Sequence, residues 1–319
     1  MSKINIRIPK ILKSDFKAED YILHEELKNA IEVAIALNQP LLLTGEPGTG
    51  KTKLAYKVAK ELAKDKSSGF DFEEAPSIFY TKTTSSARDL FYTYDTLLHF
   101  QAANLKKNDG ESAASTAEFI NLQAFGKAIA NTNPSNIDTS MFRTKLAAKP
   151  KSTVVLIDEI DKAPRDFTND ILNEIENYHF QIREQDNYAI NRDDQQRIFV
   201  IMTSNSEKNL PDAFLRRCVF YNIPFPKQEL LLEIAKNQLG ADTQFTETLL
   251  NELIEKFNEI RKQAVRKPPA TAELIAWLRI LELQGFIEKG ADERKTQLLN
   301  NLSILVKTQE DLEAIKGIF

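Results

Sequence analysis

Gly45-Glu46-Pro47-Gly48-Thr49-Gly50-Lys51-Thr52 is the stretch that decides the fold of this chain. It satisfies in full the pattern G-x-x-x-x-G-K-[ST] of a phosphate-binding loop. Three of the chain's 10 glycines lie in this octet, because backbone N–H groups that approach phosphate oxygens need conformations that a Cβ would obstruct. We expect the Lys51 ammonium to contact the β- and γ-phosphates and the Thr52 hydroxyl to bind Mg²⁺. The octet therefore predicts a nucleoside triphosphate as ligand.

The segments on either side of the octet predict a strand, a loop and a helix in that order. Residues 40–44, Pro-Leu-Leu-Leu-Thr, are typical of a short buried strand. After the octet, the apolar residues fall on one helical face: Leu54, Ala55, Val58, Ala59, Leu62 and Ala63. This order places the phosphate at a helix N-terminus, where free N–H groups and the helix dipole attract anions.

The composition is that of an ordinary soluble globular protein, with 42% hydrophobic and 28% charged residues. Its length predicts about two domains. A single cysteine, Cys218, indicates a reducing compartment, so we expect a cytoplasmic protein. No segment has the roughly 18 apolar residues of a membrane span, and we expect no membrane partner. The net charge of −4 and the lack of a basic stripe argue against nucleic acid as a ligand.

Further apolar runs predict a doubly wound parallel sheet in an α/β domain. They lie at residues 77–81, 154–157 and 198–202, with a weaker candidate at 218–221, and a helical pattern spans 167–178. Two stretches are too long for simple crossovers, so we expect insertions around 82–150 and 180–196. The second has the alternation of a hairpin. Within the first, the polar residues 106–112 predict an exposed loop or a disordered tip.

No strand-like run follows Pro224-Phe225-Pro226. From residue 228 onward the apolar residues keep helical spacing, and Trp277 falls within that pattern as a core residue. The sequence therefore predicts a nucleotide-binding α/β domain at 1–225 and an all-helical lid domain at 226–319.

Polar side chains follow two of the predicted strands. Asp158-Glu159 comes directly after the run 154–157, and Asn205 follows the run 198–202. Open α/β sheets place their ligands at this carboxyl edge. We expect Asp158 to hold Mg²⁺, Glu159 to polarise a water that attacks the γ-phosphate, and Asn205 to orient that water.

Two arginines, Arg216 and Arg217, close a short predicted helix before the last strand. In a monomer they are helix-terminal charges facing water. In a ring they would reach the γ-phosphate of the neighbouring subunit as arginine fingers in trans.

Together these stretches resemble an AAA+ ATPase, and more narrowly the MoxR branch of that superfamily. The resemblance rests on residues 40–48, 87–95, 156–163, 169–172 and 210–218. It implies Walker A at 45–52, Walker B at Asp158-Glu159, sensor 1 at Asn205 and an arginine finger at Arg217 or Arg216, with Arg217 preferred. It also implies ATP and Mg²⁺ as cofactors, a hexameric ring of identical subunits, and a chaperone-like action on a protein client, in some members beside a von Willebrand A domain partner.

One departure from that family concerns the sensor 2 arginine of the lid. The corresponding stretch is Lys267-Pro268-Pro269-Ala270-Thr271-Ala272, without an arginine in register, although Arg266 and Arg279 lie nearby.

The sequence thus favours a cytoplasmic Mg²⁺-dependent ATPase that remodels or assembles a protein partner. One alternative is a nucleotide-gated scaffold or signalling switch with slow hydrolysis, and another is a DNA-acting AAA+ motor subunit. A P-loop kinase ranks last, because an acidic pair suits water activation and the lid is a full helical domain.

Overall fold

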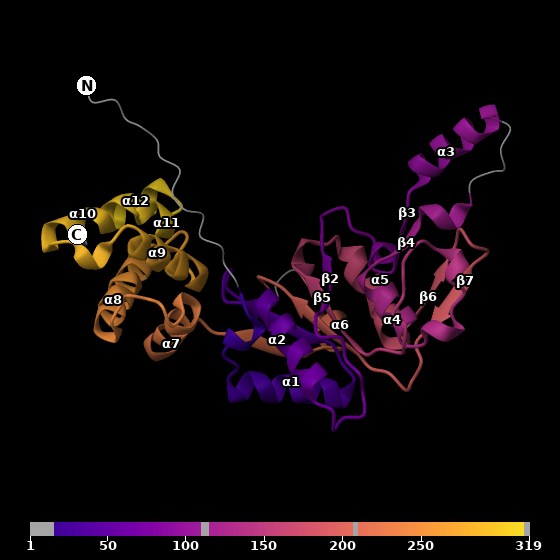
Figure 1. The fold of residues 1–319 in the computed structure, drawn as a ribbon, viewed down its shortest axis with the longest axis horizontal. Coiled ribbons are helices and arrows are strands. Elements are labelled where there is room, and N and C mark those ends of the chain that lie inside the picture. Colours follow the sequence, from indigo (N-terminus) through magenta and orange to yellow (C-terminus); the bar gives the residue numbers. More distant parts are fainter. Residues whose placement is uncertain (1–15, 110–114, 207–209, 316–319) are drawn as a thin grey trace. The chain divides into compact units, whose positions relative to one another are not determined.

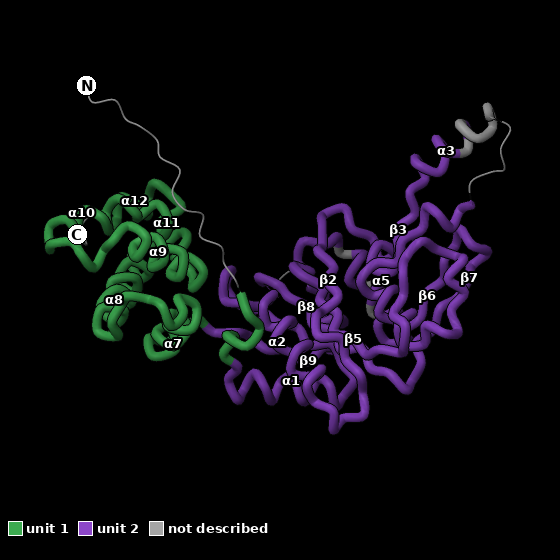
Figure 2. The backbone as a smooth tube through the Cα atoms, in the orientation of Figure 1, with its two compact units in different colours: residues 1–22, 225–319 green, residues 23–224 purple. Residues whose placement is uncertain are grey.

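A computed structural model describes residues 16–109, 115–206 and 210–315 of the chain. It forms two compact units, residues 23–224 and residues 225–319 together with the N-terminal 22 residues (Figure 2). The predicted boundary near residue 225 places residues 16–22 in the α/β domain. In the structure, the short 3-10 helix Ala18–Asp20 packs on the first helix of the C-terminal unit.

A five-stranded parallel sheet forms the centre of the larger unit. Its strands lie in the order β2-β5-β8-β1-β9, so that β8 separates β1 from β5. Their bounds are Ser77–Tyr80 for β2, Thr153–Asp158 for β5, Ile198–Thr203 for β8, Leu41–Gly45 for β1 and Val219–Ile223 for β9. The predicted parallel α/β sheet is confirmed, and the weaker strand candidate corresponds to β9.

Helices cover both faces of this sheet, which explains why its central strands are continuous apolar runs. They are α1 (Glu25–Leu37), α2 (Lys51–Lys64), α4 (Ala124–Asn131) and α5 (Arg165–Asn177) (Figure 1). Successive side chains of a strand point to opposite faces. One set, which includes Leu42, Ile157 and Met202, packs in a cluster with buried residues of α4 and α5. The alternate set faces α2, which contacts β1, β5 and β8.

The first predicted insertion lies between β2 and β5. It contains the antiparallel strands β3 (Tyr92–Tyr94) and β4 (Ile120–Leu122), with α3 (Thr96–Asp109) between them. The prediction of a loop over 106–112 was wrong for residues 106–109, which continue α3, and residues 110–112 lie outside the described residues. Polarity alone does not separate a solvated helix from a loop, and the lysines at 106 and 107 are good helix formers.

The second predicted insertion is confirmed as a hairpin of β6 (His179–Ile182) and β7 (Tyr188–Asn191). Its turn holds Asp186 and Asn187 at φ values of 49° and 59°. Asp and Asn are enriched in this left-handed region, so the turn residues favour the observed connection.

The smaller unit is helical, with no strand among residues 225–315. Its helices are α7 (Gln228–Leu239), α8 (Glu247–Gln263), α9 (Thr271–Leu283), α10 (Ala291–Asn300), α11 (Leu302–Leu305) and α12 (Gln309–Ile315). Trp277 of α9 is fully buried in a cluster with apolar residues of α7, α8 and α11, as predicted for a core residue. Within the parts of the chain that the structure describes, none of the helices combines the length and apolarity needed to cross a bilayer.

Candidate nucleotide-binding site

Three glycines shape the loop between β1 and α2. Gly45, Gly48 and Gly50 have φ values of 145°, 80° and 89°, which residues with a Cβ rarely adopt. A Cβ on Gly45 would also lie 2.7 Å from the carbonyl oxygen of Ile223 in β9. Glu46 and Pro47 are exposed at the tip, and the Thr49 hydroxyl donates to the Glu46 carbonyl at 2.8 Å. The glycines therefore fix a turn that leads directly into the N-terminus of α2.

Lys51 begins α2 and is largely buried, with 8% of the residue exposed. Nζ donates to the carbonyl oxygens of Gly45 at 2.8 Å and Glu46 at 3.0 Å, and to Oδ1 of Asn205 at 3.0 Å. These bonds use all three donors of the ammonium. Burial lowers the pKa of Lys51. Four nearby carboxylates act in the opposite direction and raise it, Asp161 most strongly. A phosphate group offers this cation charged acceptors, which bind more strongly than carbonyl or amide oxygens.

Thr52 and Asp158 meet at the carboxyl end of β5. The Thr52 hydroxyl lies 3.1 Å from each oxygen of the Asp158 carboxylate, which is itself nearly buried. Thr203, the last residue of β8, donates its hydroxyl to Oδ1 of Asp158 at 2.6 Å. A hydroxyl and a carboxylate side by side are hard oxygen donors of the kind that Mg²⁺ prefers. These two side chains therefore fit the metal that the sequence implies.

Glu159 follows Asp158 in a left-handed conformation, with φ 57° and ψ 50°. Its backbone N–H donates to the Thr203 hydroxyl at 2.9 Å. Its carboxylate pairs with Lys162 at the end of the 3-10 turn η6 (Ile160–Lys162). A left-handed glutamate costs about 1 kcal/mol or more, and such strained residues gather at functional sites. The left-handed conformation thus costs folding stability and turns Glu159 away from the regular path of β5.

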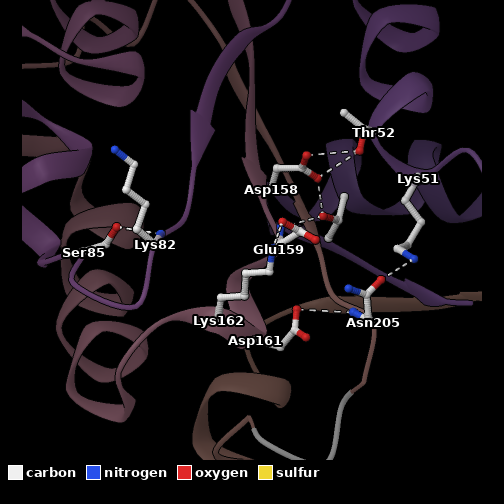
Figure 3. Close-up of polar contacts among 10 residues, drawn as sticks. Lys51, Thr52, Lys82, Ser85, Asp158, Glu159, Asp161, Lys162 and Asn205 are labelled. Atoms are coloured by element: carbon white, nitrogen blue, oxygen red, sulfur yellow. Dashed lines mark hydrogen bonds and ion pairs between the residues drawn. The ribbon is translucent and has the colours of Figure 1, made fainter. Parts of the chain in front are cut away.

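Asn205 lies just beyond β8, and its position depends on the strand order. Because β8 lies between β1 and β5, the end of β8 reaches the space between the phosphate loop and the acidic pair. Figure 3 shows the Asn205 amide directed at Lys51 and its backbone N–H directed at Asp161, with an N···O distance of 3.3 Å to Oδ1. The structure therefore brings together Lys51, Thr52, Asp158, Glu159 and Asn205, which lie up to 154 positions apart in sequence.

The two predicted arginine fingers lie outside this cluster. Arg216 follows the short helix α6 (Asp212–Leu215) with an exposed side chain. Arg217 forms an ion pair through Nε with Oε1 of Glu176 in α5, at 3.1 Å. Both arginines are solvent-exposed, which a residue that acts on another subunit requires.

Arg266 and Arg279, which lie near the position of the missing sensor 2 arginine, form hydrogen bonds within the helical unit. Arg266 donates through Nε to Oε2 of Glu310 at 2.6 Å. Arg279 donates to the carbonyl oxygen of Gln238, at the end of α7, at 2.7 Å. These contacts tie the α8–α9 loop to α12 and tie α9 to α7 within the unit.

Three residues of the site were missed by sequence reasoning: Thr203, Asp161 and Lys162. Thr203 carried a signal, since it is a hydroxyl at the end of a buried apolar run, one position before Ser204-Asn205. Asp161 and Lys162 look like ordinary surface charges in the sequence. Only the turn that follows the left-handed Glu159 directs Asp161 toward Asn205 and Lys162 toward Glu159.

A phosphate loop after β1, an acidic pair after β5 and a polar amide after the intervening β8 define a P-loop nucleoside triphosphatase fold. The family model for the ATPase family associated with various cellular activities (AAA) matches residues 41–226. The chain therefore belongs to the AAA family.

Among solved structures, the chain is similar to one described as the structure of C. elegans PCH-2. The two share 19% sequence identity with a TM-score of 0.41, over 94% of this chain and 70% of that chain. No curated protein matches this sequence.

Proposed function

We propose that this AAA family member is a Mg²⁺-dependent ATPase that converts ATP and water to ADP and phosphate. The observation that carries the proposal is the hydrogen-bonded cluster of Lys51, Thr52, Asp158 and Asn205 at one edge of the sheet, beside Glu159. Membership of an ATPase family supports ATP as the nucleotide.

Each group in the cluster has a distinct role in this proposal. The N–H groups of the phosphate loop and the Lys51 ammonium bind the β- and γ-phosphates. Thr52 and Asp158 would hold Mg²⁺, which when bound neutralises charge on the phosphate oxygens. Glu159 accepts a proton from the water that attacks the γ-phosphorus in line, while Asn205 orients that water. The bond between the γ-phosphorus and the bridging oxygen then breaks, and ADP leaves.

The proposal extends to the assembly in which the ATPase works. AAA family members generally form rings that act on protein substrates, and we propose a ring, hexameric as in the MoxR branch, that remodels a cytoplasmic protein partner such as a von Willebrand A domain protein. The exposed Arg217, or Arg216, would complete the neighbouring subunit's site. Residues 226–319 would be the lid that moves on hydrolysis.

A second candidate function is a nucleotide-gated switch with slow hydrolysis. It is favoured by the contacts of Arg266 and Arg279, which hold both side chains on groups of their own unit rather than leaving them for a γ-phosphate. The two candidates differ in turnover, not in nucleotide binding.

Steady-state ATP hydrolysis by the purified chain and its Glu159→Gln variant separates the two candidates. We expect turnover by the wild-type chain and a loss of about 100-fold or more in the variant, with ATP binding retained, because the amide cannot take the proton. Glu233→Gln in α7 is the matched control and should leave the rate unchanged. Wild-type binding without turnover would instead establish the switch.

A mixing experiment tests the ring and the arginine fingers. Arg217→Ala subunits retain Glu159, and Glu159→Gln subunits retain Arg217, so a mixed ring contains some sites with both groups intact. We expect the mixture to recover activity that neither variant has alone. The same mixture made with Arg216→Ala identifies which arginine acts, and an absence of recovery with either would exclude action in trans.

A further inference from the structure

The 3-10 turn η6 follows Glu159 directly and carries two charged side chains that diverge. Lys162 reaches back to the Glu159 carboxylate, and Asp161 reaches across to the backbone of Asn205 (Figure 3). The turn is held by its own backbone, since the Lys162 N–H donates to the Glu159 carbonyl at 3.0 Å and the Ala163 N–H to Ile160 at 3.1 Å. Ile160 is fully buried and anchors the turn to the core.

The pairing with Lys162 engages one oxygen of the Glu159 carboxylate, Oε2. The backbone of Glu159 is fixed separately, by its left-handed conformation and by the N–H bond to Thr203. The Glu159 side chain has three torsions of its own. Among the residues that the structure describes, Lys162 restricts these torsions through its ion pair with the carboxylate. A paired Oε2 leaves Oε1 to receive a proton.

The contact from Asp161 restrains the backbone of Asn205, whose side chain is the other polar group of the proposed reaction. Its Oδ1 accepts the Asn205 N–H at 3.3 Å, while the Asn205 side chain contacts Lys51. Asn205 is exposed and lies beyond the last ladder bond of β8. Its neighbour Ser204 is held by a backbone bond to Leu43 in β1, and Asp161 adds a restraint on the backbone of Asn205 itself.

We infer that Asp161 and Lys162 are positioning residues of the ATPase site, which together set the geometry between the Glu159 carboxylate and the Asn205 amide. The inference rests on the proposed function. One short turn contacts both the Glu159 carboxylate and the backbone of Asn205, so their spacing is set locally rather than by separate loops. Removing either contact should impair the chemical step and leave nucleotide binding intact.

The Lys162 contact is tested by comparing Lys162→Met with Lys162→Arg. We expect the methionine variant to lose about 10-fold in kcat, since a displacement of about 1 Å at a reacting group can cost this much or more. Its KM for ATP should stay within about twofold, because uniform binding is unchanged. Arginine keeps the charge and should retain most of the rate. Lys256→Met is a matched control, since Lys256 pairs with Glu259 at the same three-residue spacing on α8.

The Asp161 contact is tested by amide hydrogen exchange at Asn205 as well as by turnover. Asp161→Ala removes the acceptor, so we expect about 10-fold faster exchange at Asn205 and a loss in kcat. Asp161→Asn retains Oδ1 and should restore the protection. Unchanged exchange in Asp161→Ala, an unchanged kcat in Lys162→Met, or equal losses in Lys162→Met and Lys162→Arg would each overturn the inference. If the wild-type chain does not hydrolyse ATP, the proposed function fails, and the exchange comparison still decides whether Asp161 holds Asn205.

Discussion

Replacing Thr203 by valine should weaken the site and the larger unit at the same time. Thr203 is 1% exposed, and its hydroxyl both donates to Asp158 and accepts from the Glu159 N–H. Valine has nearly the same shape, so the change removes two hydrogen bonds without leaving a cavity. A bond to a charged group contributes about 1.5–3 kcal/mol and a neutral one about 0.5–1.5 kcal/mol. We therefore expect Thr203→Val to lose about 2–4 kcal/mol of stability, the combined contribution of the two lost bonds.

The assay is native-state amide exchange of peptides from β5 and β8, which reports the opening free energy of this unit separately from the helical unit. Thr203→Ser is the control, since it keeps the hydroxyl and loses only a methyl group, at a cost of about 1 kcal/mol. ATP turnover should fall in the valine variant and persist in the serine variant, because Thr203 also holds Glu159. The reasoning is refuted if valine is tolerated as well as serine, since packing rather than hydrogen bonding would then account for the buried threonine.

Three further predictions concern packing and charge away from the site. Gly126→Ala in α4 should destabilise the larger unit by about 2 kcal/mol despite alanine's higher helix propensity. The reason is that the new Cβ would lie 2.0 Å from the carbonyl oxygen of Phe91. A raised melting temperature would contradict this. Trp277→Ala should cost the helical unit about 3–5 kcal/mol, measured by exchange in α8 and α9, and a smaller loss would show that the cluster collapses around the gap. Hydrogen bonds from the Arg266 N–H, the Thr308 hydroxyl and the Lys267 N–H hold the pKa of Asp311 below its ordinary 3.8. The stabilisation from this carboxylate is therefore present above about pH 4 and lost as the pH falls through the lowered pKa. Asp311→Asn should be less stable than the wild type at pH 7, and the difference should shrink in acid; a difference independent of pH would assign the loss to packing instead.

Several parts of the site could be predicted from the sequence because their signals are local. The phosphate loop needs glycines at fixed spacing, and the run at 154–157 ends in Asp158-Glu159 whatever the rest of the chain does. The hairpin at β6–β7 and the burial of Trp277 also followed from short-range periodicity. The loop expected over 106–112 was wrong at 106–109 for a local reason too, since a polar helix and a polar loop share the same composition.

The sequence by itself determined that a phosphate loop, an acidic pair and a polar amide follow three buried strands, because each motif is written in consecutive residues. Tertiary structure alone decided that β8 lies between β1 and β5, so that Asn205 reaches Lys51 and Thr203 reaches Asp158. Strand order depends on which apolar faces pack together across long crossovers, and no local pattern encodes that choice. The same holds for Asp161 and Lys162, whose directions follow from the left-handed backbone of Glu159 rather than from their own residue types.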